Sequence, residues 1–139
     1  MKNIFLSLMV FVVMSLLHAQ FTDWSLVFTD GKSGGIAMAP ISVLLSGLMV
    51  SAIRFLTVLI FNKAYNTILK NAVLFEIIYL FTLIISGANP FAYFTGGEEI
   101  LFLDFLLYLN SFFVLLMMFL IDRLYSKINL AKSKNNIDQ

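Results

Sequence analysis

Four long apolar runs are the feature that most constrains how this chain can fold. They cover residues 4–20, 40–61, 72–88 and 100–121. A helix rises about 1.5 Å per residue, so about 20 apolar residues are needed to cross the hydrocarbon core of a bilayer. The second and fourth runs reach this length, and the third is slightly short and would use interfacial residues at its ends. The sequence therefore predicts membrane-spanning helices.

The composition favours a membrane protein over a soluble one. Hydrophobic residues make up 60% of the 139 residues and charged residues make up 12%, whereas ordinary globular chains have about 25% charged residues. A soluble domain of this composition would expose large apolar patches to water. We therefore expect an all-α fold, a small polytopic membrane helix bundle with four spans, or with three spans after a cleaved signal peptide.

The first run allows both of these alternatives. Lys2, an apolar core of about 14 residues and a cleavage point after Ala19 are typical of a secretory signal peptide. However, Leu17 occupies a position where a small residue is preferred. One face of a helix over this run carries three polar residues, which are Ser7, Ser15 and His18. That pattern is typical of a retained helix inside a bundle, and the other three helices keep the same topology in either case.

The chain divides into four segments on this basis. Residues 1–20 form the first transmembrane helix or the signal peptide, and residues 21–39 form an outward-facing loop. Residues 40–124 form a three-helix transmembrane bundle, and residues 125–139 form a cytoplasmic polar tail. Pro40 suits the start of a helix, because the first turn has no backbone hydrogen bond to lose.

The distribution of charge predicts the orientation in the membrane. Basic residues gather on one side of the predicted spans: Lys2, Lys63, Lys70, Arg123, Lys127, Lys132 and Lys134. The opposite loops hold Lys32 with four acidic residues, Asp23, Asp30, Glu98 and Glu99. Basic residues remain on the cytoplasmic side of membrane proteins. We therefore expect a bacterial inner (plasma) membrane protein, with both termini in the cytoplasm if the first helix is retained.

Two charged residues lie inside the apolar runs and need a partner there. Arg54 lies seven residues before Phe61, and Glu76 lies five residues after Asn71. These spacings place them about 10 Å and about 8 Å from the same end of a helical hairpin. A charge inside a span costs about 2.5–3.5 kcal/mol on insertion scales. We therefore predict an Arg54–Glu76 ion pair, which either clamps the two helices together or handles ions or protons.

Small and polar residues gather on one face of each predicted span. Besides the two charged residues, they are Ser46, Gly47 and Ser51 in the second span and Tyr79, Thr82 and Ser86 in the third. Gly47 and Ser51 are four residues apart, a spacing that allows two helices to approach closely. Asn110, near the middle of the fourth span, is expected to bond to another helix. His18 is expected to be a polar residue at the membrane interface.

Several classes of chemistry are not supported by the sequence. The chain has no cysteine and one histidine, which excludes thiol chemistry and clusters of Cys or His around a metal or haem. The net charge is +1, and no basic patch indicates a nucleic-acid partner. No pair of nucleophile and base is evident. We therefore expect a protein that is not an enzyme and that has no cofactor or metal.

The remaining functions are those of a small integral membrane protein. We expect a helical subunit of a membrane assembly, secretion or transport complex, whose partners are the lipid bilayer and either another membrane protein or further copies of itself. The alternative is a small oligomeric transporter or channel, linked to ions or protons, that uses Arg54 and Glu76.

Overall fold

The computed structural model describes residues 2–28, 38–61, 63–96 and 99–135. These residues form α1 (Lys2–Ser25), η1 (Leu26–Phe28), α3 (Ala39–Ile60), α4 (Ile68–Ile85), α5 (Ala92–Gly96) and α6 (Glu99–Asn135). No strand occurs among them, which confirms the predicted all-α fold. Part of the outward-facing loop predicted over residues 21–39 lies outside the described residues, as does the end of the predicted tail.

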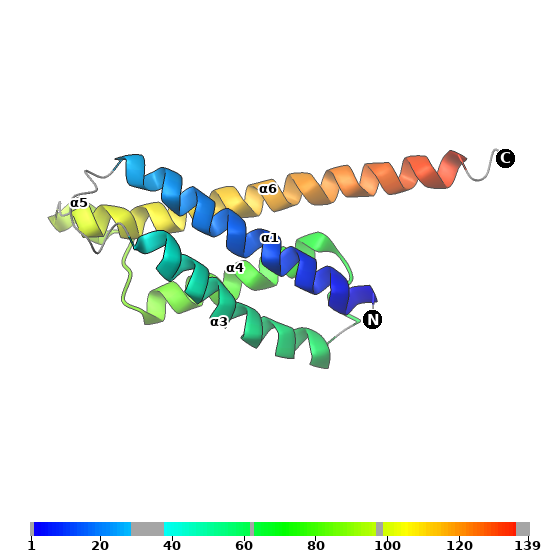
Figure 1. Cartoon of the computed structure of the whole chain (residues 1–139), viewed down its shortest axis with the longest axis horizontal. Coiled ribbons are helices and arrows are strands. Elements are labelled where there is room, and N and C mark those ends of the chain that lie inside the picture. Colours follow the sequence, from blue (N-terminus) through cyan, green and yellow to red (C-terminus); the bar gives the residue numbers. More distant parts are fainter. Residues whose placement is uncertain (1, 29–37, 62, 97–98, 136–139) are drawn as a thin grey trace.

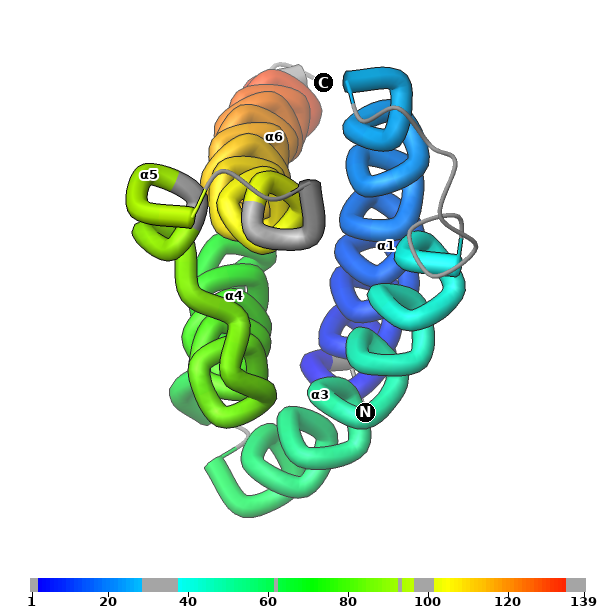
Figure 2. The backbone as a smooth tube through the Cα atoms, turned by 90° about the vertical axis from the view of Figure 1, so that its left-hand side faces the viewer, coloured from blue at the N-terminus to red at the C-terminus, as the bar shows by residue number. Residues whose placement is uncertain are grey.

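The long helices α1, α3, α4 and α6 alternate in direction and pack as a bundle (Figure 1). Seen along the bundle, α1 lies beside α3 and α6, and α4 lies on the other side of the centre (Figure 2). Helix α1 contacts α3, α4 and α6, while α4 also contacts α3 and α6. All four of these helices are long and apolar enough to cross a membrane. The predicted membrane helix bundle is thus compatible with the structure.

The helix ends differ from the predicted ends by a few residues. Helix α1 continues to Ser25 instead of ending near residue 20. Helix α4 begins at Ile68, where the side chain of Thr67 accepts a hydrogen bond from the Lys70 amide at 3.3 Å. It ends at Ile85, earlier than predicted, because Gly87 adopts a φ of +87° that glycine tolerates best. Residues 125–135, predicted to be a polar tail, continue α6.

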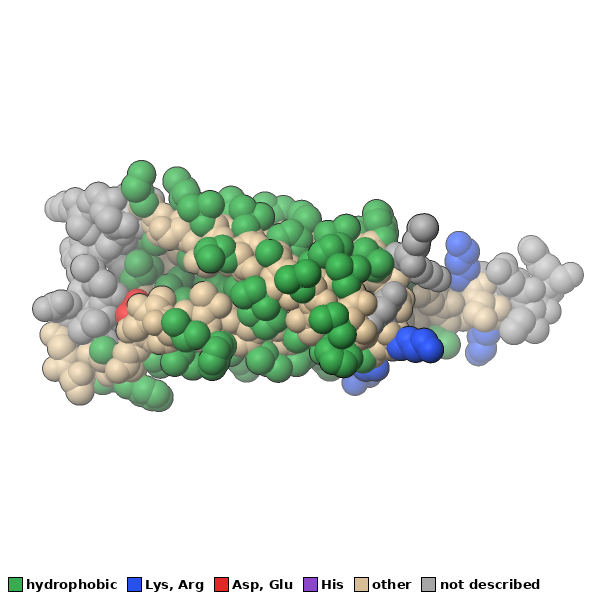
Figure 3. All heavy atoms as spheres, turned by 90° about the horizontal axis from the view of Figure 1, so that it is seen from below, with side chains coloured by type: hydrophobic (Ala, Val, Ile, Leu, Met, Phe, Trp, Pro, Cys, Tyr) green, Lys and Arg blue, Asp and Glu red, His purple; other side chains and the backbone are tan. Residues whose placement is uncertain are grey.

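The bundle buries polar side chains and exposes apolar ones. Large aliphatic and aromatic side chains cover the outside of the helices (Figure 3). The buried polar and charged side chains of the long helices are Ser7, Ser15, His18, Thr22, Ser25, Ser51, Arg54, Asn71, Glu76, Asn110 and Ser111. Around them lies a core that includes Met14, Val50, Phe75 and Val114. An apolar outside with a polar interior is the arrangement that a lipid environment favours.

Helices α1 and α3 approach closely where Ser15 meets Gly47. A Cβ atom added to Gly47 would lie 3.0 Å from Ser15 Oγ and 3.3 Å from Ser15 Cβ. The predicted close-packing surface on α3 is therefore used, and its partner is α1. Among the described residues, the buried Ser15 hydroxyl has no hydrogen-bond partner.

We expect Gly47→Ala to destabilise the bundle by about 1–2 kcal/mol, because the new methyl group overpacks the contact with α1. Ser15→Ala should be neutral or stabilising alone, since it removes an unpaired buried hydroxyl. The double variant should be less destabilised than the sum of the single effects, because the atom nearest the new methyl group is gone. Unfolding of the purified protein in mild detergent measures these effects. If the changes in unfolding free energy of the two single variants add up to the change in the double variant, the α1–α3 contact is contradicted.

Candidate functional site

The carboxylate of Glu76 is the point at which α1, α4 and α6 meet in the bundle core. Glu76 lies midway along α4 and is 3% exposed. Its Oε1 lies 2.8 Å from Nε2 of His18 on α1. Its Oε2 accepts a hydrogen bond from the Ser111 hydroxyl on α6. Both carboxylate oxygens are therefore bonded, each by a different helix.

His18 is held firmly on the other side of this contact. The imidazole is 2% exposed and α1 continues past it to Ser25, so His18 lies inside the bundle, whereas a residue at the membrane interface was expected. Its ring centroid lies 4.3 Å from that of Tyr79 and 5.8 Å from that of Phe75. The Thr22 hydroxyl donates to the His18 carbonyl at 2.7 Å, within α1. The aromatic side chains of α4 thus fix the imidazole beside Glu76.

Arg54 is also buried, but its partners differ from the predicted one. Its Nη2 donates to the Ser7 carbonyl at 3.0 Å, to the Ser7 hydroxyl at 3.1 Å and to Asn71 Oδ1 at 2.9 Å. Among the described residues, Glu76 contacts His18 instead of Arg54, and the predicted Arg54–Glu76 pair is not formed. The structure does place both residues in the bundle interior, as the sequence indicates.

Side-chain direction explains why the predicted pair does not form. The pair was predicted because Arg54 and Glu76 lie at similar distances from the same helix ends. Similar depth does not determine which helix a side chain faces, and the face of α3 that carries Arg54 also contacts α1. The guanidinium reaches Asn71 at the start of α4, five residues before Glu76, or about 8 Å nearer the inner end. Asn71 is suited to this contact, because its Nδ2 donates to the carbonyls of Tyr65 and Thr67 and leaves Oδ1 to accept.

The other predicted polar residues fall into two groups. Asn110 bonds across helices as expected, and its partner is Ser25 of α1, with Nδ2 donating to Ser25 Oγ at 2.9 Å. The predicted serine and threonine hydroxyls donate to backbone carbonyls three or four residues earlier in the chain: Ser46 to Ser42 O, Ser51 to Gly47 O, Thr82 to Ile78 O and Ser86 to Leu83 O. These residues satisfy their polar groups locally and make no contact of this kind with another helix.

A cavity at the end of the bundle where α3 begins is lined by both polar and apolar residues. It measures about 370 Å³ and is lined by α3, α4 and α6. Its polar lining is made of Ser42, Ser46, Ser86 and Asp104, and Tyr79 also lines it. The Tyr79 hydroxyl is buried and has no hydrogen-bond partner among the described residues. Because Tyr79 also contacts the His18 ring, it connects the cavity to the His18–Glu76 pair.

The groups that meet at this centre are an imidazole, a carboxylate and a hydroxyl. Ser111 bonds to Glu76 instead of to His18, so the three residues do not form the hydroxyl–imidazole contact of a nucleophilic triad. An imidazole and a carboxylate joined by one hydrogen bond can exchange a proton. Within the described part of the chain, no group of three His, Cys, Asp or Glu residues is placed to hold a metal.

Sequence reasoning did not identify His18, Ser111, Ser7 and Asn71 as partners in these contacts. One signal was available, because Ser7, Ser15 and His18 share a face of the first helix. Comparison of the sequence with protein families, and of the chain with curated proteins and solved structures, finds no match.

Double-mutant cycles test which of these buried side chains interact with each other. We expect about 1–3 kcal/mol of coupling between Arg54→Gln and Asn71→Ala, and between His18→Ala and Glu76→Gln, because each pair shares a buried hydrogen bond. The Arg54→Gln and Glu76→Gln pair should show less coupling than either. The measurement is the free energy of unfolding in mild detergent. A larger coupling for Arg54 with Glu76 would show that they form the ion pair after all.

Proposed function

We propose that this chain is a non-enzymatic integral membrane protein that serves as a proton-linked transport subunit. The observation that carries the proposal is the buried hydrogen bond between His18 and Glu76. A buried ionisable residue in a span is a functional candidate because its burial is costly. Here two such residues, from α1 and α4, share one hydrogen bond in the bundle core.

The surroundings of the pair support proton movement in one direction. The outer cavity reaches Tyr79, and the Tyr79 ring lies against His18. On the inner side, Arg54 lies between the pair and the inner helix ends, bonded to Ser7 and Asn71. A fixed positive charge opposes the passage of cations. Protons would therefore enter from the outer cavity, and release on the inner side would require a change in packing around Arg54.

The charge distribution supports placement in a plasma membrane. Exposed lysine and arginine side chains lie at the end of the molecule where α6 projects, and an acidic side chain shows at the other end (Figure 3). The chain starts at the basic end, and the α3–α4 turn also lies there (Figure 1). By the positive-inside rule, this end faces the cytoplasm. The cavity lined by Asp104 then faces outward.

Proton uptake into liposomes that contain the purified protein tests this function. Under an imposed membrane potential, a pH-sensitive dye should report faster acidification than in liposomes without protein. Glu76→Gln should reduce the rate to the protein-free level, because the amide cannot take up the proton that the carboxylate binds. Tyr79→Phe should slow it at least several-fold while leaving the fold intact, since the hydroxyl makes no hydrogen bond among the described residues.

Asp23→Asn is the matched control, because Asp23 is an exposed carboxylate on α1. Its rate should equal that of the unmodified protein. Equal rates for the unmodified protein and Glu76→Gln, at any level, would contradict the proposal and leave the centre as a structural contact between helices.

A second candidate function, that of a subunit docked on a larger membrane complex, is favoured by the end of α6. This helix projects beyond the rest of the bundle (Figure 1). At 37 residues, it is about 55 Å long, whereas the hydrocarbon core is about 30 Å thick. The projecting part exposes Leu124, Tyr125 and Ile128 on one face. An apolar stripe on a helix outside the membrane fits a partner helix.

Replacing Leu124 and Ile128 together by serine tests this second candidate. We expect the double variant to lose a co-purifying membrane protein or a homo-oligomer, as measured by mass in mild detergent. The melting temperature of the bundle should remain within about 2 °C, because a surface substitution changes stability little. Leu130→Ser is the control, since Leu130 is exposed on the opposite face. The same mass for the double variant and the unmodified protein would exclude docking through this stripe.

A further inference from the structure

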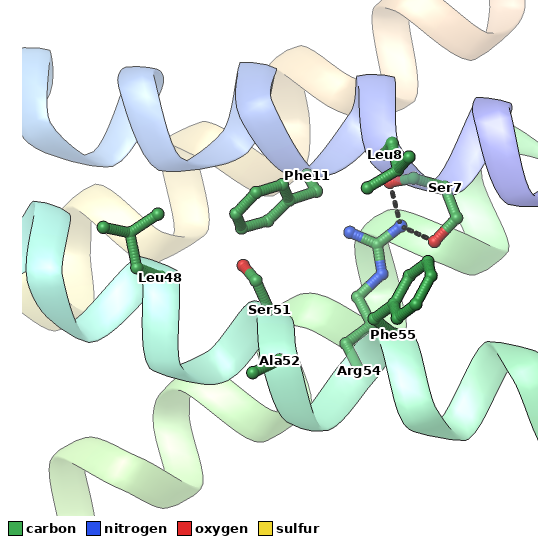
Figure 4. A pocket seen from close by; sticks show the side chains of 8 residues that line it. All are labelled: Ser7, Leu8, Phe11, Leu48, Ser51, Ala52, Arg54 and Phe55. Atoms are coloured by element: carbon green, nitrogen blue, oxygen red, sulfur yellow. Dashed lines mark hydrogen bonds between the residues drawn. The ribbon is translucent and has the colours of Figure 1, made fainter.

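A second cavity, between α1 and α3, is lined in part by Arg54. It measures about 280 Å³ and is lined by Ser7, Leu8, Phe11, Leu48, Ser51, Ala52, Arg54 and Phe55. It belongs to the inner half of the bundle and is distinct from the outer cavity beside Tyr79. Figure 4 shows the Arg54 guanidinium between the two helices, with Nη2 turned to Ser7 and the other terminal nitrogen directed toward Phe11.

The guanidinium is buried, and its positive charge is not neutralised by a carboxylate. Arg54 is 1% exposed. Among the described residues, Nη2 bonds to neutral oxygens only, and neither Nη1 nor Nε has a hydrogen-bond partner. Unpaired donors of a buried charge are costly, because the charge has lost its water and gained no counter-ion. An oxyanion beside Nη1 would supply an acceptor for one of these nitrogens and the missing negative charge.

The walls of the cavity indicate what carries that oxyanion. Leu8 and Leu48 are about half exposed on the outside of the bundle, where lipid would lie, and Ala52 is also exposed. Leu48 lies six residues before Arg54 on α3, which places it about 9 Å closer to the middle of the membrane. The charged end of the cavity therefore lies toward the inner surface, and its apolar end lies toward the middle. A lipid of the inner leaflet has the same orientation, with its headgroup at the inner surface and its acyl chain toward the middle.

We propose that this cavity binds an acidic lipid of the inner leaflet, whose carboxylate or phosphate contacts Nη1 of Arg54 and whose acyl chain lies along Phe11 and Leu48. This inference goes beyond the proposed proton-linked function, because it concerns a different cavity and does not require that protons move. In this arrangement Arg54 binds the charged headgroup of the lipid, and the apolar side chains around it contact the acyl chain. The cavity volume is close to the lower limit for small-molecule sites, which is about 300 Å³, so one headgroup and part of one acyl chain fill it.

The test uses the full chain, purified in mild detergent and freed of lipid, with binding measured by native mass spectrometry and by the shift in melting temperature. The probes are oleate, lysophosphatidate, oleyl alcohol and inorganic phosphate. Oleate and lysophosphatidate differ in the oxyanion, oleyl alcohol lacks the charge, and phosphate lacks the chain. We expect at least one of the two acidic lipids to bind at least tenfold tighter than both oleyl alcohol and inorganic phosphate, and the tighter one identifies the headgroup.

Two variants and one control locate the site. Arg54→Gln removes the charge, and Ala52→Phe fills the cavity from its exposed edge while Arg54 keeps its hydrogen bonds. Each should weaken binding of the acidic lipid at least tenfold. If Arg54→Gln does not fold, Ala52→Phe still decides the outcome. Lys63→Gln, which removes an exposed cation near the inner end, should bind as the unmodified protein does.

Four results would overturn the proposal. Oleyl alcohol binding as tightly as the acidic lipids would show that the charge is not recognised. Inorganic phosphate binding as tightly as they do would show that the anion is not carried by a lipid. Unchanged binding in Ala52→Phe, or an equal loss in Lys63→Gln, would show that the lipid binds elsewhere.

Discussion

The need to satisfy the polar face of α1 determines how the other helices pack. In a bilayer, a buried polar group finds no water and must bond within the protein. Helix α1 carries Ser7, His18 and Ser25 into the bundle at three depths, and each meets a different helix: Ser7 contacts Arg54 of α3, His18 contacts Glu76 of α4, and Ser25 contacts Asn110 of α6. Removal of residues 1–19 as a signal peptide would leave Arg54 and Glu76 without these partners, which favours a retained first helix.

These contacts also explain how much of the molecule could be predicted from its sequence. The spans followed from length and hydropathy, because crossing a membrane places a strong constraint on both. The burial of Arg54 and Glu76 followed from the cost of exposing charge to lipid. Their partners did not follow, because partner choice depends on helix rotation, and several neighbours offered a polar atom at a suitable depth. Asn71 served as a reference point for depth in the sequence, whereas in the structure it is the residue that Arg54 contacts.

The structure differs from the prediction at His18 for a similar reason. A single histidine near the end of an apolar run is often a residue of the interface, and the predicted first span ended soon after it. The observed helix continues to Ser25, so His18 lies inside the span rather than at its end. The polar residues Thr22 and Ser25 made the extension hard to see from hydropathy. Both donate to carbonyls four residues earlier in α1, so the helix satisfies their hydroxyls without water.

The charges of the core would link the proposed proton-binding centre to the proposed lipid cavity. The fully buried ionisable groups among the described residues of the spans include Arg54, His18 and Glu76. When His18 is neutral, the charge of Glu76 balances that of Arg54 across the core, although the two side chains are not paired. When a proton binds to the His18–Glu76 pair, the core has an excess positive charge. In a low dielectric this charge interacts strongly with other charges several ångströms away. An anion beside Arg54 would neutralise it, so proton binding and lipid binding would each stabilise the state that favours the other.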